Sequence, residues 1–192
     1  MSLIFGKAYY LRAAWGPRAE TPAALANRFI NTIDRLRGIS PLLETWLIER
    51  KPYEKMRPNC ARYIASTISK DDFGEIEEIY GYALGAYTRE KVTPLTFGLN
   101  INAGATNNQP FVNYAELEVG SGAIPAPEAI DYKIFKAALL TLVDTWKPDM
   151  CRARSSELRK ISESLNEPAY WMIYLTAHLA PFVTPPETSV CC

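Results

Sequence analysis

Apolar side chains recur at every second position in several segments of the 192-residue chain. Residues 8–15 alternate in this way and predict a half-buried β-strand, with Tyr9, Leu11, Ala13 and Trp15 on one face. The same spacing recurs in residues 79–88, 95–102 and 111–119. The short connections between these runs predict antiparallel neighbours with one apolar face and one face in water.

Two other segments carry apolar residues at helical spacing. The first begins after Thr21, a hydroxyl cap followed by Pro22, and ends at Gly38. The second begins after Asp131 and ends before Pro148. The apolar stripes of the two predicted helices are Leu25, Ala26, Phe29, Ile30, Ile33 and Leu36, and Phe135, Ala138, Leu139, Leu142, Val143 and Trp146.

The remaining segments have weaker patterns. Residues 44–50 predict a short strand and residues 51–58 a loop, after which Asn59 caps a short helix with Ile64 and Ile68 on its inner side. Residues 149–166 fit a short strand followed by a helical turn, and residues 169–177 predict a buried strand.

Together these elements predict an α+β fold, a single domain with a mainly antiparallel β-sheet packed against two long amphipathic helices. The domain is expected to span residues 1–182, and residues 183–192 form a Pro-rich C-terminal tail.

Composition narrows the classes of function. The 21 basic and 21 acidic side chains balance, so the sequence lacks the basic excess with which nucleic-acid binders neutralise phosphates. Neither a secretory signal nor an apolar run long enough to span a membrane is present. The four cysteines fit neither a disulfide framework nor a zinc site. We therefore expect a reduced cytoplasmic protein without a metal or cofactor.

The chemistry of an enzyme is not visible in the sequence. Nucleophilic catalysis needs a base held beside a Ser or Cys, and the one histidine, His178, lies in an apolar stretch without a nucleophile motif. We expect no catalytic residues and no small-molecule substrate.

Acidic and tyrosine side chains provide the candidate binding residues. An acidic run without an interleaved base is either a solvated segment or a patch that docks on a basic protein surface. The tyrosines that follow it, and those beside acids on a strand, suit either an interface or packing against the helices. The candidate set is Asp71, Asp72, Glu75, Glu77, Glu78, Tyr80, Tyr82, Tyr87, Tyr114, Glu116 and Glu118.

The tetrapeptide WGPR lies between the first predicted strand and the first predicted helix. Trp15 shares a strand face with Tyr9 and Leu11, so its indole is expected in the core. Gly16 and Pro17 then turn the chain toward the helix, which makes Trp15, Gly16 and Pro17 a structural joint. Arg18 is expected either to pair with a nearby acid or to reach a partner.

The order of these landmarks resembles the immunity protein 52 family. The resemblance rests on residues 10–21 with WGPR, the helix after them, and the segment from Ser40-Pro41 to Trp46. It continues through the central hairpins with LNINAGA, the helix ending in LVDTWKPD and the aromatic segment YWMIYL, over residues 8–182. Residues 51–80 match loosely.

The resemblance implies a non-catalytic antitoxin of bacterial type VI secretion or polymorphic-toxin systems. Members neutralise, by direct binding, a nuclease toxin with a restriction-endonuclease-like fold. The expected partner is therefore a cognate nuclease toxin, with no direct contact to nucleic acid or membrane. The alternatives are a structural adaptor or effector-loading chaperone of a secretion system, and an enzyme on an unfamiliar α+β scaffold.

Overall fold

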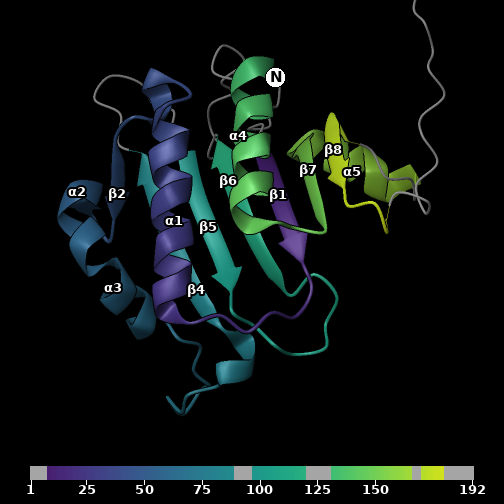
Figure 1. The fold of residues 1–192 in the computed structure, drawn as a ribbon. Helices are drawn as coiled ribbons and strands as arrows, with labels where there is room; N and C mark the ends of the chain where they lie inside the picture. The colour runs from purple at the N-terminus through teal and green to yellow at the C-terminus, as the bar shows by residue number, and fades with distance from the viewer. Residues whose placement is uncertain (1–7, 89–96, 120–130, 166–169, 180–192) are drawn as a thin grey trace, which may run out of the picture.

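Eight strands form one sheet in the order β3-β2-β4-β5-β6-β1-β7-β8, and every neighbouring pair is antiparallel (Figure 1). The chain is described by a computed structural model over residues 8–88, 97–119, 131–165 and 170–179. The strands are β1 (Tyr9–Trp15), β2 (Trp46–Ile48), β3 (Lys51–Pro52), β4 (Tyr82–Thr88), β5 (Phe97–Ala103), β6 (Asn113–Val119), β7 (Met150–Ser155) and β8 (Met172–Leu175). The predicted α+β class with an antiparallel sheet is confirmed.

The apolar and polar residues that alternate in the sequence lie on opposite faces of the sheet. Leu11, Leu99 and Leu117 share one row across β1, β5 and β6 and are almost fully buried. The residues between them in each strand, such as Asn100 and Glu116, face the other side. One face of the sheet is therefore apolar and the other carries polar side chains.

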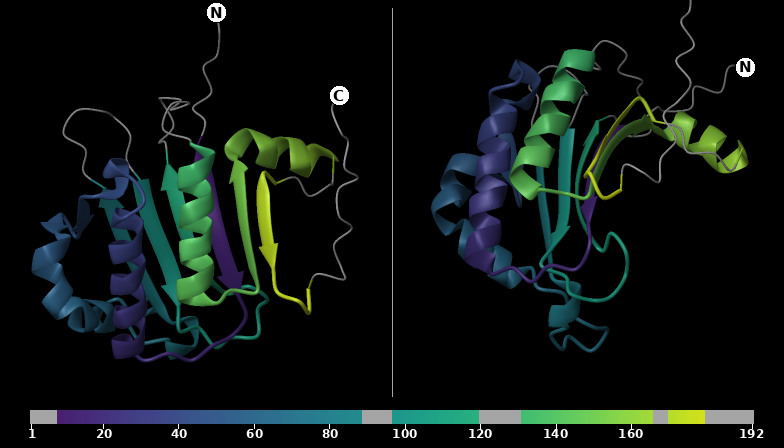
Figure 2. Two further views of the ribbon diagram at one scale, coloured as in Figure 1. Left: turned by 45° about the horizontal axis from the view of Figure 1, so that its top comes forward. Right: turned by 45° about the vertical axis from the view of Figure 1, so that its right-hand side comes forward.

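Helices cover the apolar face. Figure 2 shows α1 (Pro22–Arg37) and α4 (Tyr132–Trp146) side by side on that face, while the opposite face of the central strands has no described helix over it. The other helices are α2 (Tyr53–Met56), α3 (Cys60–Ser66) and α5 (Ser156–Leu165), with 3₁₀ turns at Pro41–Leu43, Arg57–Asn59 and Glu78–Tyr80. The prediction of two long helices is thus incomplete, because α3 and α5 add to the pair.

Both long helices begin at the residues that the sequence predicts. Thr21 Oγ1 accepts a hydrogen bond from the backbone N–H of Ala24 at 3.3 Å, and Asp131 Oδ1 accepts one from Lys133 N–H at 2.7 Å. Each bond satisfies an N–H that has no partner within its own helix. The C-terminal cap of α1 is Gly38, and that of α4 is Lys147, which adopts a left-handed conformation with φ of 49°.

Two tryptophans join β1 to the helix layer. The rings of Trp15 and Trp146 stack with centroids 5.4 Å apart and an interplanar angle of 19°. Trp146 Nε1 donates a hydrogen bond of 3.0 Å to Thr32 Oγ1 in α1, so the indole is both buried and satisfied. This group therefore connects the end of β1, the middle of α1 and the end of α4.

The segment after Trp15 is held by hydrogen bonds and an ion pair in which side chains take part. Gly16 N–H donates to Asp149 Oδ2 at 3.1 Å, and Asn113 Nδ2 donates to the Gly16 carbonyl at 2.7 Å. Arg18 pairs with Glu20 at 3.1 Å and donates to the carbonyl of Trp146 at 3.0 Å. These bonds tie the turn between β1 and α1 to β6 and to the end of α4.

Several weaker predictions need correction. The predicted loop at 51–58 contains β3 and α2, because Glu49 and Arg50, with φ of 49° and 64°, turn the chain back on β2. Asn59 makes no capping hydrogen bond. Ile68 lies beyond α3, where it bridges to Tyr82.

The predicted buried strand at 169–177 is also wrong in part. Strand β8 is shorter and pairs only with β7 among the described strands, so it is an edge strand. Trp171 and Ile173 are 45% and 42% exposed. By contrast, residues 150–165 form a strand followed by a helix, as predicted. The Pro-rich tail at 183–192 lies outside the described residues.

We predict that Trp146→Ala lowers the free energy of unfolding by about 3–5 kcal/mol, because it removes a buried indole and leaves a cavity. Urea unfolding followed by circular dichroism measures this loss. Trp171→Ala is the control, because this residue is 45% exposed although its ring contacts Tyr9 and Phe135, and we expect a smaller loss, of about 1–2 kcal/mol. Equal losses for the two variants would contradict the assigned core.

Candidate functional site

The segment 69–81, here called the acidic loop, connects α3 to β4 and projects beyond the end of the sheet (Figure 1). It is a small hairpin, in which Lys70 bridges to Ile76. Ser69 N–H donates to the Gly81 carbonyl at 2.9 Å, and Glu77 N–H donates to the Ser69 carbonyl at 3.0 Å. The loop therefore has an ordered backbone of its own.

Asp71 shapes the tip of the acidic loop. Its Oδ1 accepts hydrogen bonds from the backbone N–H groups of Phe73 at 2.9 Å and Glu75 at 2.8 Å. Gly74 follows with φ of +86°, a conformation that residues with a Cβ rarely adopt. The carboxylate of Asp71 thus has a structural role, and Phe73 is held at the turn.

The base of the loop is fixed against the turn after β5. Gly81 has φ of +72°, and a Cβ there would lie 2.4 Å from the Ala103 carbonyl oxygen, so only glycine fits. The Ile79 carbonyl accepts from Thr106 N–H at 3.0 Å and Asn107 N–H at 3.2 Å. These contacts set the direction in which the loop leaves the sheet.

Apolar side chains are exposed between the acids of the loop. Phe73 is 92% exposed, and Ile76, Ile79 and Tyr80 are 58%, 51% and 42% exposed. Within the described residues, none of the loop's five carboxylates has a Lys or Arg within ion-pair distance. The loop therefore presents an apolar centre with unpaired negative charge around it.

Phe73, Ile76 and Ile79 were missed as candidates in the sequence. The available signal was the interleaving of Phe73, Ile76 and Ile79 with acids in DDFGEIEEIY. This spacing is close to the helical period, but Gly74 interrupts the segment and its many acids leave no apolar stripe wide enough to predict burial.

The other candidate residues do not lie on the acidic loop. Tyr87, Tyr114, Glu116 and Glu118 lie on the uncovered face of the sheet. Tyr82 lies on the opposite face from Tyr87 and packs against the core. The structure thus brings together Asp71, Asp72, Glu75, Glu77, Glu78 and Tyr80, and separates them from the sheet residues.

On the uncovered face, Arg12 organises the acids nearest to it. Its Nη1 lies 3.3 Å from Glu116 Oε2, and its guanidinium stacks 3.9 Å from the centre of the Tyr114 ring. Glu118 forms no ion pair with a described residue. Partial burial, with a smaller contribution from the charge of Glu116, raises the pKa of the Glu118 carboxyl.

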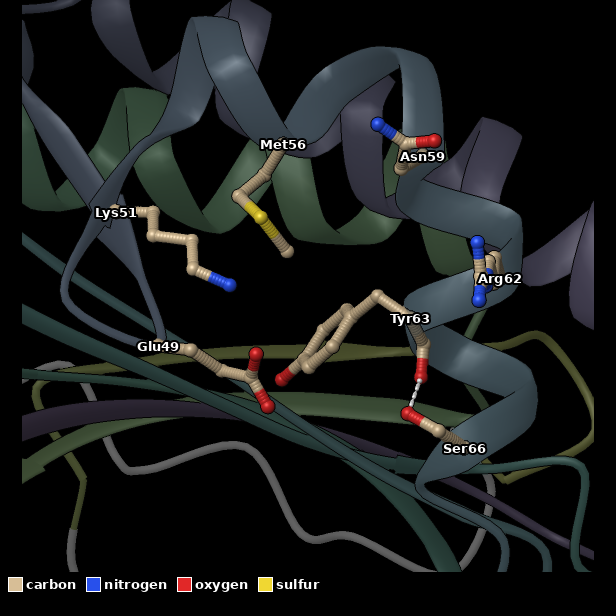
Figure 3. Close-up of a pocket in the computed structure, with 7 residues that line it drawn as sticks. All are labelled: Glu49, Lys51, Met56, Asn59, Arg62, Tyr63 and Ser66. Atoms are coloured by element: carbon tan, nitrogen blue, oxygen red, sulfur yellow. Dashed lines mark hydrogen bonds between the residues drawn. The ribbon is translucent and has the colours of Figure 1, made fainter.

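A third feature is a recess of about 350 Å³ between the β2–β3 turn and α3 (Figure 3). Burial raises the pKa of Tyr63, whose hydroxyl oxygen accepts from Gly85 N–H at 3.4 Å. Ser66 Oγ, the hydroxyl in this recess, donates to the Tyr63 carbonyl at 2.6 Å. The seven described residues that line the recess provide no nucleophile held by a base.

His178 lies on the surface after β8, with its side chain 65% exposed. Its Nδ1 is 3.0 Å from Thr176 Oγ1 and its Nε2 is 3.8 Å from Asp149 Oδ1. Thr176 Oγ1 is also 3.3 Å from the Asp149 carbonyl, to which it donates. These contacts tie the end of β8 to the residue before β7.

The described part of the chain contains no helix whose length and apolar character would allow it to cross a bilayer. Nor do three or more His, Cys, Asp or Glu side chains gather there in an arrangement that could hold a metal ion.

Comparison with protein families gives a match over nearly the whole chain. The model of the family described as "Immunity protein 52" matches residues 7–190. The chain therefore belongs to the immunity protein 52 family, as its landmarks suggest. A comparison with curated proteins returned no match.

We predict that Glu118→Gln stabilises the protein at pH 7. A raised carboxyl pKa means that the folded state disfavours the charged form, so stability falls as pH rises through that pKa. The glutamine variant should therefore melt about 1–3 °C higher at pH 7. The gain should vanish below about pH 4, where the glutamate is also protonated.

Differential scanning calorimetry at the two pH values measures this difference. Glu75→Gln serves as the control, because the Glu75 side chain is exposed on the acidic loop. The melting temperature of this variant should match that of the natural protein at both pH values. A lower melting temperature for Glu118→Gln at pH 7 would show that the charged carboxylate is stabilised instead.

Proposed function

We propose that this member of the immunity protein 52 family is an antitoxin that binds a cognate secreted nuclease toxin in the cytoplasm and neutralises it. The producing cell and its siblings would thereby be protected. Family membership supports an inhibitor rather than an enzyme. The observation that carries the proposed mode of binding is the acidic loop, in which exposed apolar side chains stand among unpaired carboxylates.

The apolar part of the loop has the composition of an interface centre. Phe73, at 92% exposure, gains no burial within the described fold. Aromatic side chains at the centre of an interface, surrounded by polar groups that exclude water, carry most of the binding energy in many complexes. We infer that Phe73 enters a pocket of the toxin and that Ile76 and Ile79 pack beside it.

The charge of the loop suits a nuclease as partner. A nuclease binds a polyanion, so the surface that receives nucleic acid is expected to be basic. Five carboxylates without a counter-ion in the described fold offer the complementary charge. Such complementarity accelerates association and selects the partner. On this proposal, the loop occupies the basic surface that nucleic acid would otherwise reach.

The order of the loop supports a tight complex. The hydrogen bonds of Asp71 and the fixed position of Gly81 hold the backbone before a partner arrives. A surface that is ordered in the free protein loses less conformational entropy on binding. Exposed charges should therefore govern the association rate, and the apolar centre the dissociation rate.

We predict that Phe73→Ala weakens binding to the cognate toxin at least tenfold, mostly through faster dissociation. Tyr132→Ala is the matched control, because Tyr132 is 62% exposed on α4, away from the acidic loop. Surface plasmon resonance measures both rates. Replacing Asp72, Glu75, Glu77 and Glu78 with Lys, while Asp71 is kept because it holds the loop tip, should also weaken binding more than tenfold, with slower association.

Co-expression tests the function itself. The natural protein should restore growth of cells that express the toxin, and the Phe73→Ala variant should require a higher dose. Unchanged affinity of both loop variants would remove the loop from the interface and leave the antitoxin function standing. Binding without restored growth would instead favour an adaptor or loading chaperone.

A further inference from the structure

A recess of about 330 Å³ opens on the uncovered face of the sheet, between β1, β6, β7 and the start of α5. We call it the arginine recess, and it lies away from the acidic loop. The loop joins β4 at Tyr82, which pairs with Ala103, whereas Glu118 in the recess pairs with Gly98 near the other end of β5. Its main lining residues are Tyr10, Arg12, Glu116, Glu118, Arg152 and Arg154.

Strand register concentrates positive charge in this recess. Arg12 lies directly opposite Arg152 across β1 and β7, and Tyr10 lies opposite Arg154. Like charges in directly opposite positions destabilise an antiparallel pair. The carboxylate of Glu116 forms an ion pair with Arg12 at 3.3 Å and so reduces the repulsion. Placing Arg12 opposite Arg152 is nevertheless an arrangement that packing alone does not favour.

Arg152 and Arg154 have no carboxylate partner among the described residues. Arg152 Nη1 donates to the Tyr170 hydroxyl at 3.2 Å, and its guanidinium lies 5.5 Å from the centre of that ring. The guanidinium of Arg154 lies 5.2 Å from the centre of the Tyr10 ring. The Nε groups of both arginines are buried without an acceptor. Both cations are thus held in place by aromatic rings without charge neutralisation.

This geometry favours carboxylates as the ligand. A guanidinium binds a carboxylate through two parallel hydrogen bonds, and the tyrosine rings beside Arg152 and Arg154 restrict these side chains before a ligand arrives. Glu116 and Glu118 line the same recess and repel any anion, and this repulsion grows with the charge of the ligand, so a singly charged carboxylate suits the recess better than a doubly charged phosphate. The volume lies at the lower end of the range for ligand pockets, enough for side chains of a protein segment.

We propose that the arginine recess binds the carboxylate side chains of an acidic segment of a partner protein, with Arg152 and Arg154 as the receiving groups. This inference does not depend on the acidic loop or on the toxin. The protein would then have two binding surfaces, an acidic loop that binds a basic partner surface and an arginine recess that binds an acidic one.

A capped hexaglutamate peptide is the probe, titrated into the full chain by isothermal calorimetry at low and moderate salt. We expect saturable binding that weakens with salt and falls at least fivefold in Arg152→Ala and in Arg154→Ala. The control is Arg62→Ala, which removes one exposed arginine far from the recess and should bind like the natural protein. Circular dichroism verifies that each variant is folded.

Arg154→Lys separates the bidentate site from simple attraction, because it keeps the charge and loses the planar fork. We expect it to bind more weakly than the natural protein. Absence of saturable binding would overturn the proposal, and so would equal weakening by Arg62→Ala. Tighter binding of a hexathymidylate oligonucleotide than of hexaglutamate would also overturn it, in favour of a nucleic-acid surface.

Discussion

The packing of α1 and α4 against a single face of the sheet determines where the other features of this protein lie. The buried rows of β1, β5 and β6 face these helices, and Trp146 and Thr32 join the helices to each other. Because the strands alternate, the remaining side chains must face the other side. That face keeps charged and aromatic groups in contact with solvent, and the loops at the strand ends are free to project.

Much of this arrangement could be predicted from the sequence, because the spacing of apolar residues along a strand or helix shows which of its faces is buried. The caps at Thr21 and Asp131 and the alternation in β1, β5 and β6 are local signals. Local patterns fail where tertiary pairing decides the outcome. Glu49 and Arg50 adopt positive φ at the turn after β2, although neither is a residue type that favours this conformation. The apolar composition of β8 predicts a buried strand, whereas the structure places it at the edge of the sheet.

The candidate binding residues show the same limit. The acidic run could be found from composition, but the exposure of Phe73 depends on how Asp71 and Gly81 fold the loop. Tyr82 and Tyr87 are five positions apart, so the alternation of β4 already places them on opposite faces, but which of the two faces the helices cover depends on the tertiary packing. The arginines of β1 and β7 come together only because these two strands, far apart in the chain, are neighbours. Their shared face could not be inferred without the strand order.

We propose that this member of the family binds its toxin through the acidic loop. Hydrogen–deuterium exchange of the free chain and of its complex with the toxin can locate the contact, because it compares the loop with the helices and the sheet in one experiment. We expect slower exchange in the complex at residues 69–81, and at Thr106 and Asn107, which support the loop, with α1 and α4 unchanged. Protection confined to the helix layer, with residues 69–81 exchanging as in the free chain, would show that the toxin binds elsewhere.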